Sequence, residues 1–165
     1  MRKVAFINIP DNIQKLMIYD SPEGVFLFGY DCLQDTSAIW DNWYAVVTDA
    51  EEYCSDTYQI DKDDWIVISD PCPECQHDFI AQIRIKGRDT SNPQFGQLQT
   101  FEKGVWVDTL KFDKQQSFDG MTGNERLYVS GLITEFDNAK RNDKRKTIKI
   151  LAALRFDKES ISKIV

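Results

Sequence analysis

The stretch KLMIYDSPEGVFLFGYDC, residues 15–32, decides the fold of this chain. Two apolar runs flank SPEG, residues 21–24, which is a four-residue turn signal, so the stretch predicts a β-hairpin. In the second run both sets of alternating residues are apolar. A strand that is apolar on both faces is buried on both, so we expect 25–30 to lie in the middle of a sheet.

Further strands are predicted outward from this hairpin. Each candidate segment is a short apolar or alternating run bounded by turn formers. The predicted strands are Val4–Ile9, Trp65–Ile68, Phe79–Lys86, a second hairpin of Leu98–Phe101 and Val105–Leu110 around EKG, and a C-terminal hairpin of Leu127–Phe136 and Thr147–Phe156. The basic segment DNAKRNDKRK, residues 137–146, would form the tip of that last hairpin.

One helix interrupts the strands. In TDAEEYCSDTY the apolar residues Ala50, Tyr53, Cys54 and Tyr58 recur with the spacing of a helix face, which predicts a helix near 49–58. The fold class predicted from sequence is therefore α+β, with a mostly antiparallel sheet, one short helix and a C-terminal β-hairpin.

Length and charge bear on domain organisation. The chain has 165 residues, which predicts one domain spanning 1–165. A subdivision is conceivable at the turn-rich loop 113–124, because 1–112 has a net charge of −10 while the remainder has +3, with the mildly basic part at 125–165.

The acidic residues concentrate in one stretch. Between Leu16 and Ile83 there are 15 acidic residues and one basic residue, Lys62. A field of one sign over that much chain attracts basic proteins and repels nucleic acid. The alternative is a merely well-solvated surface. The basic residues at 140–146 run against this trend and could contact nucleic acid or the acidic part of a second copy in a homodimer.

Location and thiol state follow from what the sequence does not contain. The first apolar run is short and closed by Pro10, and no apolar run reaches the length of a membrane span. We therefore expect a cytoplasmic protein that does not enter a membrane. Its four cysteines are then predicted to be reduced, since they do not form the dense pattern of a secreted disulfide scaffold.

The segment DPCPECQHD, residues 70–78, raises three chemical hypotheses. Cys72 and Cys75 have the spacing of half a zinc knuckle, but no second pair supplies the other ligands. The same spacing suits a redox pair, yet the acids Asp70, Glu74 and Asp78 would raise the thiol pKa values. A nucleophile made of Cys75 and His77 would place both groups two residues apart on one element, whereas catalytic dyads usually draw on separate elements, and the chain has no second histidine. We interpret the segment as a stiff turn and predict no cofactor or metal; if a metal binds, Cys72 and Cys75 are its ligands.

A second segment, YDCLQDTSAIWDNWY, residues 30–44, interleaves acids with aromatics, which is how a surface grips Lys and Arg side chains. The alternative is that both tryptophans pack under a loop. The predicted partner-binding residues are Asp31, Asp35, Trp40, Asp41, Trp43, Tyr44, Glu51 and Glu52.

The function predicted from these features is that of a non-enzymatic interaction protein. It would be an acidic inhibitor of the immunity-protein type, occluding a basic partner such as a toxin nuclease. The alternatives are a zinc-stabilised binding domain using Cys72 and Cys75, or an enzyme with unidentified carboxylates. No phosphate-binding or dinucleotide-binding loop is present, and DKDD, residues 61–64, lacks the glycine and glutamate of a calcium loop.

Overall fold

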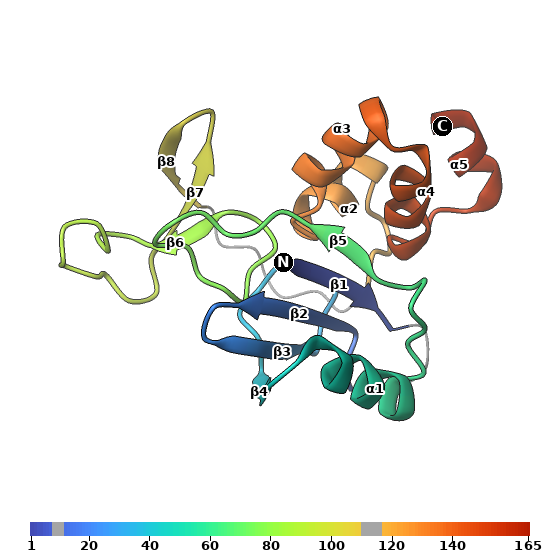
Figure 1. Cartoon of the computed structure of the whole chain (residues 1–165). Coiled ribbons are helices and arrows are strands. Elements are labelled where there is room, and N and C mark those ends of the chain that lie inside the picture. Colours follow the sequence, from blue (N-terminus) through green and yellow to red (C-terminus); the bar gives the residue numbers. More distant parts are fainter. Residues whose placement is uncertain (8–11, 110–116) are drawn as a thin grey trace.

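A five-stranded antiparallel sheet forms the centre of the computed structural model, which describes residues 1–7, 12–109 and 117–165 (Figure 1). Its strand order is β4-β3-β2-β1-β5. The strands are β1 (Arg2–Phe6), β2 (Lys15–Ser21), β3 (Gly24–Tyr30), β4 (Trp40–Tyr44) and β5 (Ile66–Ile68). The predicted central position of the 25–30 run is confirmed, because β3 lies between β2 and β4. Residues 8 and 9 of the predicted first strand lie outside the described residues.

The hairpin predicted around SPEG is confirmed as the pair of β2 and β3. Lys15 lies opposite Tyr30 and Ser21 opposite Gly24, so Pro22 and Glu23 are the two turn residues. Gly24 has φ +124°, a conformation that only glycine adopts without strain. The turn chemistry therefore sets the register of the whole pair.

The two faces of this sheet bury two separate cores. On one face, helix α1 (Val47–Tyr58) packs Ala50, Cys54 and Tyr58 against the sheet. On the other face, the apolar side chains of β1 and β5 meet those of the C-terminal helices in one continuous cluster. Because that cluster joins the sheet to residues 118–154, the two oppositely charged parts of the chain share a core.

A second, three-stranded sheet stands beside the first (Figure 1). It comprises β6 (Ile83–Ile85), β7 (Leu98–Glu102) and β8 (Val105–Asp108). The hairpin predicted around EKG is confirmed, with Lys103 and Gly104 both at positive φ in its tight turn. The strand predicted over 79–86 is shorter, because Phe79 and Ile80 are buried in a loop and only 83–85 pair with β7. Leu110 lies outside the described residues.

The C-terminal part is helical, which corrects the strands predicted at 127–136 and 147–156. It forms α2 (Gly123–Val129), α3 (Ile133–Asn142), α4 (Lys144–Ala153) and α5 (Lys158–Ile164). The α+β class stands, but five helices are present in the described residues rather than one. The predicted basic hairpin tip is the junction of α3 and α4, where Asp143 caps α4 by accepting a hydrogen bond from the Lys146 amide.

The first strand carries a buried cation that ties the sheet to the loop before β6. Arg2 is fully buried, and its guanidinium donates to the backbone carbonyls of Ser69, Phe79 and Ile80. Burial lowers the pKa of Arg2. Among the described residues, no helix is long and apolar enough to cross a membrane.

Candidate functional site

An acidic groove runs between helix α1 and the turn that follows it. Helix α1 ends at Tyr58, and the capping residue Gln59 has a left-handed conformation (φ 57°) in which its amide donates to carbonyls of the last helical turn. The Asp61 amide donates to the Asp64 carboxylate (2.8 Å), and the Asp64 amide donates to the Asp61 carbonyl (3.0 Å). Residues 61–64 therefore form a tight turn closed by these two hydrogen bonds.

The groove has a volume of about 780 Å³ and a predominantly acidic lining. Its floor contains the buried side chains of Ile60 and Trp65, and its walls bring acids from helix and turn together. The lining residues are Thr48, Glu51, Glu52, Ser55, Ile60, Asp61, Lys62, Asp63, Asp64 and Trp65. Five carboxylates face one lysine across this groove.

One of these carboxylates, that of Glu51, is paired with a buried cation. Lys3 of β1, itself buried, forms an ion pair with Glu51, and its ammonium lies 5.0 Å from the centre of the Trp65 ring. Glu51, one of the predicted partner-binding residues, lines the groove, but its charge is compensated by Lys3. Among the described residues, no ion pair engages Glu52 or Asp63, and both are exposed.

The two tryptophans of β4 lie on opposite faces of the sheet. Trp40 and Tyr44 pack against the core under α1, and the Tyr44 ring lies 6.1 Å from that of Tyr53. Trp43 is 59% exposed and pairs with Phe26, which faces the other core. Because alternate strand residues point to opposite faces, Asp41 accompanies Trp43 rather than Trp40. The predicted aromatic surface is therefore divided, and no single partner segment lying on one face contacts both tryptophans.

Asp35 has a structural role instead of the predicted surface role. Its carboxylate oxygens accept hydrogen bonds from the Ile80 amide (2.7 Å) and the Ala81 amide (2.8 Å). Burial raises its pKa, while nearby Lys15 acts in the opposite direction. Asp31 lies half-buried just after β3, away from the groove lining.

The Cys72–Cys75 segment is a hydrogen-bonded turn, as interpreted from sequence. The Cys75 amide donates to the Cys72 carbonyl (3.2 Å), and the two sulfur atoms lie 3.0 Å apart. Cys54 lies on the buried face of α1, and Cys32 lies beside Thr36 (3.5 Å between Sγ and Oγ1). The described residues contain no group of three or more His, Cys, Asp or Glu that could hold a metal ion.

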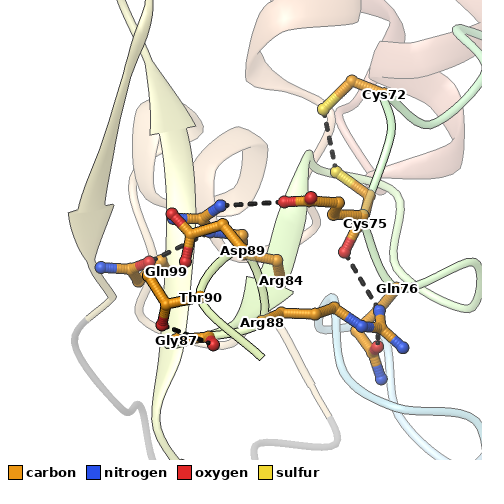
Figure 2. A network of polar contacts seen from close by, with 10 residues as sticks. Cys72, Cys75, Gln76, Arg84, Gly87, Arg88, Asp89, Thr90 and Gln99 are labelled. Carbon is orange, nitrogen blue, oxygen red and sulfur yellow. Dashed lines mark hydrogen bonds and ion pairs between the residues drawn. The ribbon is translucent and has the colours of Figure 1, made fainter. Parts of the chain in front are cut away.

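Two arginines hold this turn against the second sheet (Figure 2). Buried Arg84 forms ion pairs with Glu74 (3.1 Å) and Asp89 (3.0 Å), and its guanidinium lies 4.2 Å from the Trp106 ring centre. Arg88 donates to the Glu74 carbonyl (3.0 Å) and to the Gln76 side chain (2.8 Å). The segment is therefore anchored on both sides of its bend.

The acids around the two thiols are each engaged elsewhere, which corrects the electrostatic argument made from sequence. Glu74 pairs with Arg84, Asp70 with the N-terminal amine (3.2 Å), and Asp78 accepts from the Ala38 amide (3.0 Å). Burial, followed by the hydrogen bond with Cys72, raises the pKa of Cys75 to about 12. The neighbouring acids are not the cause.

A second groove, of about 550 Å³, lies between the small sheet and the helices and bears on the enzyme alternative. Asp35 and Glu135 both line it. Glu135 binds the Lys146 ammonium (2.7 Å) and the Ser69 amide (2.6 Å). Burial alone would raise its pKa, but these two bonds outweigh it and lower the pKa below its usual value. Both carboxylates therefore have structural partners.

Sequence reasoning missed Asp61, Asp63 and Asp64 as members of the groove. The sequence contained a pattern that could have predicted them, since these three acids come shortly after a helix whose exposed face is acidic. Comparison with protein-family models, with curated proteins and with solved structures finds no match to this chain.

Proposed function

We propose that this chain is a non-enzymatic, cytoplasmic interaction protein whose acidic groove binds a basic segment of a partner protein. The observation that carries the proposal is the groove of about 780 Å³ in which Glu52, Asp61, Asp63 and Asp64 surround an apolar floor. Lysine and arginine have long apolar stems and cationic heads, so a basic segment suits both the floor and the walls. Binding would occlude that segment, as an inhibitor of the immunity-protein type does.

Electrostatics supports recognition by steering. A concave surface lined by one sign of charge concentrates the field and raises the association rate of an oppositely charged protein. Lys3 pairs with Glu51 alone, so this buried cation does not compensate the other carboxylates of the groove. We expect a smaller aromatic contribution to partner binding than the sequence predicted, because Trp43 lies on the face of the sheet opposite to the groove.

The test compares two charge-reversed variants with the same net charge. The groove variant is Glu52→Lys with Asp63→Lys, both at exposed positions outside any described ion pair. The control variant is Asp137→Lys with Glu159→Lys, on the exposed surfaces of α3 and α5. Each immobilised protein is used to capture binding proteins from native host extract, and the captured protein is then purified for kinetics.

We expect the wild type and the control to capture the same basic protein and the groove variant to lose it. At 0.01 M salt the groove variant should associate about tenfold or more slowly, within the range attributed to steering. Association of the wild type should slow steeply by 0.1 M salt, where the screening length falls from about 30 Å to about 10 Å. Equal capture by all three proteins, a salt-independent rate, or turnover of a small molecule would refute the proposal.

A further inference from the structure

The turn of residues 72–75 places two thiols within reach of a covalent bond. The hydrogen bond from the Cys75 amide to the Cys72 carbonyl closes a four-residue turn. The ends of such a turn lie within about 7 Å of each other, and a disulfide spans about 4.4–6.8 Å between Cα atoms. The two sulfur atoms already lie 3.0 Å apart and point toward each other (Figure 2). Forming a bond requires only a small movement of the side chains.

The two thiols differ in access. Cys72 is half-buried, whereas Cys75 is 3% exposed and its Sγ donates to the Gln82 side-chain oxygen (3.4 Å). Its raised pKa keeps the Cys75 sulfur protonated at neutral pH. An external reagent therefore meets Cys72 first, and Cys75 is held directly behind it.

We propose that Cys72 and Cys75 form a dithiol site that small disulfides of the glutathione type oxidise to an intramolecular disulfide. The half-buried Cys72 thiol loses its proton to solvent, and its thiolate attacks one sulfur of the small disulfide; the S–S bond of the small disulfide breaks, a mixed disulfide forms, and the leaving small thiolate takes up a proton from solvent. The Cys75 sulfur then attacks the Cys72 sulfur, the bond between Cys72 and the small thiol breaks, and the departing small thiolate takes up the Cys75 proton. The protein loses two electrons and two protons, and the small disulfide becomes two thiols.

The surroundings favour closure over a lasting mixed disulfide. Glu74, the acid inside the turn, is neutralised by Arg84, so it does not repel a developing thiolate. Gln82 also accepts the Cys72 amide hydrogen bond (2.6 Å), which keeps the turn closed when the Cys75 thiol is consumed. This site is independent of the acidic groove and does not rest on the proposed function.

The experiment treats the reduced, folded chain with oxidised glutathione and then counts thiols and bound glutathione by mass spectrometry after denaturation. The chain starts with four free thiols. We expect the wild type to keep two thiols and to carry no glutathione. Cys75→Ser should retain one glutathione on Cys72, because the second thiol is absent. Cys72→Ser should take up none, because Cys75 is buried; Cys32 and Cys54, both 0% exposed, should stay unmodified in every protein.

Phenylarsine oxide, which bridges neighbouring thiols, tests the same pair without any substitution. The reduced wild type should bind one arsenical per chain, and prior treatment with oxidised glutathione should abolish that binding. Retention of four thiols, a lasting glutathione adduct on the wild type, or equal reactivity of Cys72→Ser and Cys75→Ser would overturn the proposal. Should a serine variant fail to fold, the wild-type thiol count and the arsenical decide the question alone.

Discussion

Replacing Glu135 by Gln should destabilise the protein in a pH-dependent way. One Glu135 oxygen accepts from the Ser69 amide at the end of β5, and the other accepts from Lys146 of α4. The carboxylate therefore ties the central sheet to two helices at a site where its side chain is 9% exposed. Glutamine has the same shape and keeps one acceptor, but its amide group would face the lysine with donors.

The magnitude follows from those two contacts. A hydrogen bond to a charged group contributes about 1.5–3 kcal/mol. Glutamine keeps the bond to Ser69 in weakened form and loses the one to Lys146, whose side chain is 24% exposed and can be partly rehydrated. We therefore expect the free energy of unfolding to fall by about 2–3 kcal/mol at neutral pH.

The pH dependence has a definite sign. The pKa of Glu135 is lower in the folded protein than its unfolded value of about 4.3, so the ionised form stabilises the fold. That contribution is present above the unfolded pKa and is lost as the pH falls through the folded pKa. The difference between wild type and Glu135→Gln should therefore shrink in acid.

The assay is urea unfolding followed by tryptophan fluorescence at about pH 7 and about pH 3, with unfolding midpoints compared at constant slope. Glu159→Gln is the matched control, because its pair with Lys163 is exposed and should contribute no more than about 0.5 kcal/mol. A loss for Glu135→Gln no larger than that of the control, or one that does not shrink in acid, would show that this carboxylate does not join the sheet to the helices.

The remaining predictions concern the edge strand, the tryptophans and the metal content. Gly29→Ala should lower the free energy of unfolding by about 1–3 kcal/mol, because a Cβ at Gly29 would lie 2.1 Å from the Trp40 ring; thermal melting measures this, and an unchanged midpoint would contradict it. Trp43→Ala should leave dissociation of the groove's partner unchanged, and faster dissociation in a folded variant would place the partner on the opposite face. Elemental analysis of untagged protein should find far less than one zinc per chain; one equivalent that Cys75→Ser removes would restore the zinc alternative.

Local patterns in the sequence were sufficient for much of the sheet and for α1. The SPEG turn set the β2–β3 register, EKG marked the second hairpin, and the helical period of 50–58 located α1 because each signal acts within a few residues. At 147–156 the same reasoning was wrong. Alternation of apolar residues suited a strand, yet Thr147, Ile150, Leu151 and Leu154 are also buried with helical spacing. The caps at Thr122, Asp143 and Asp157 are the local signals that would have favoured helices.

The sequence by itself determined the α+β class, the acidic character of residues 16–83 and the turn at Cys72. Only the tertiary structure decided which acids remain uncompensated. Lys3 of β1 neutralises Glu51 of α1, and Arg84 neutralises Glu74. The Asp35 carboxylate accepts hydrogen bonds from backbone amides of a loop more than 40 residues away along the chain. The effect of a charge and the pKa of a group depend on distance in space and on burial. These contacts join segments that are far apart along the chain, so no local sequence pattern predicts them.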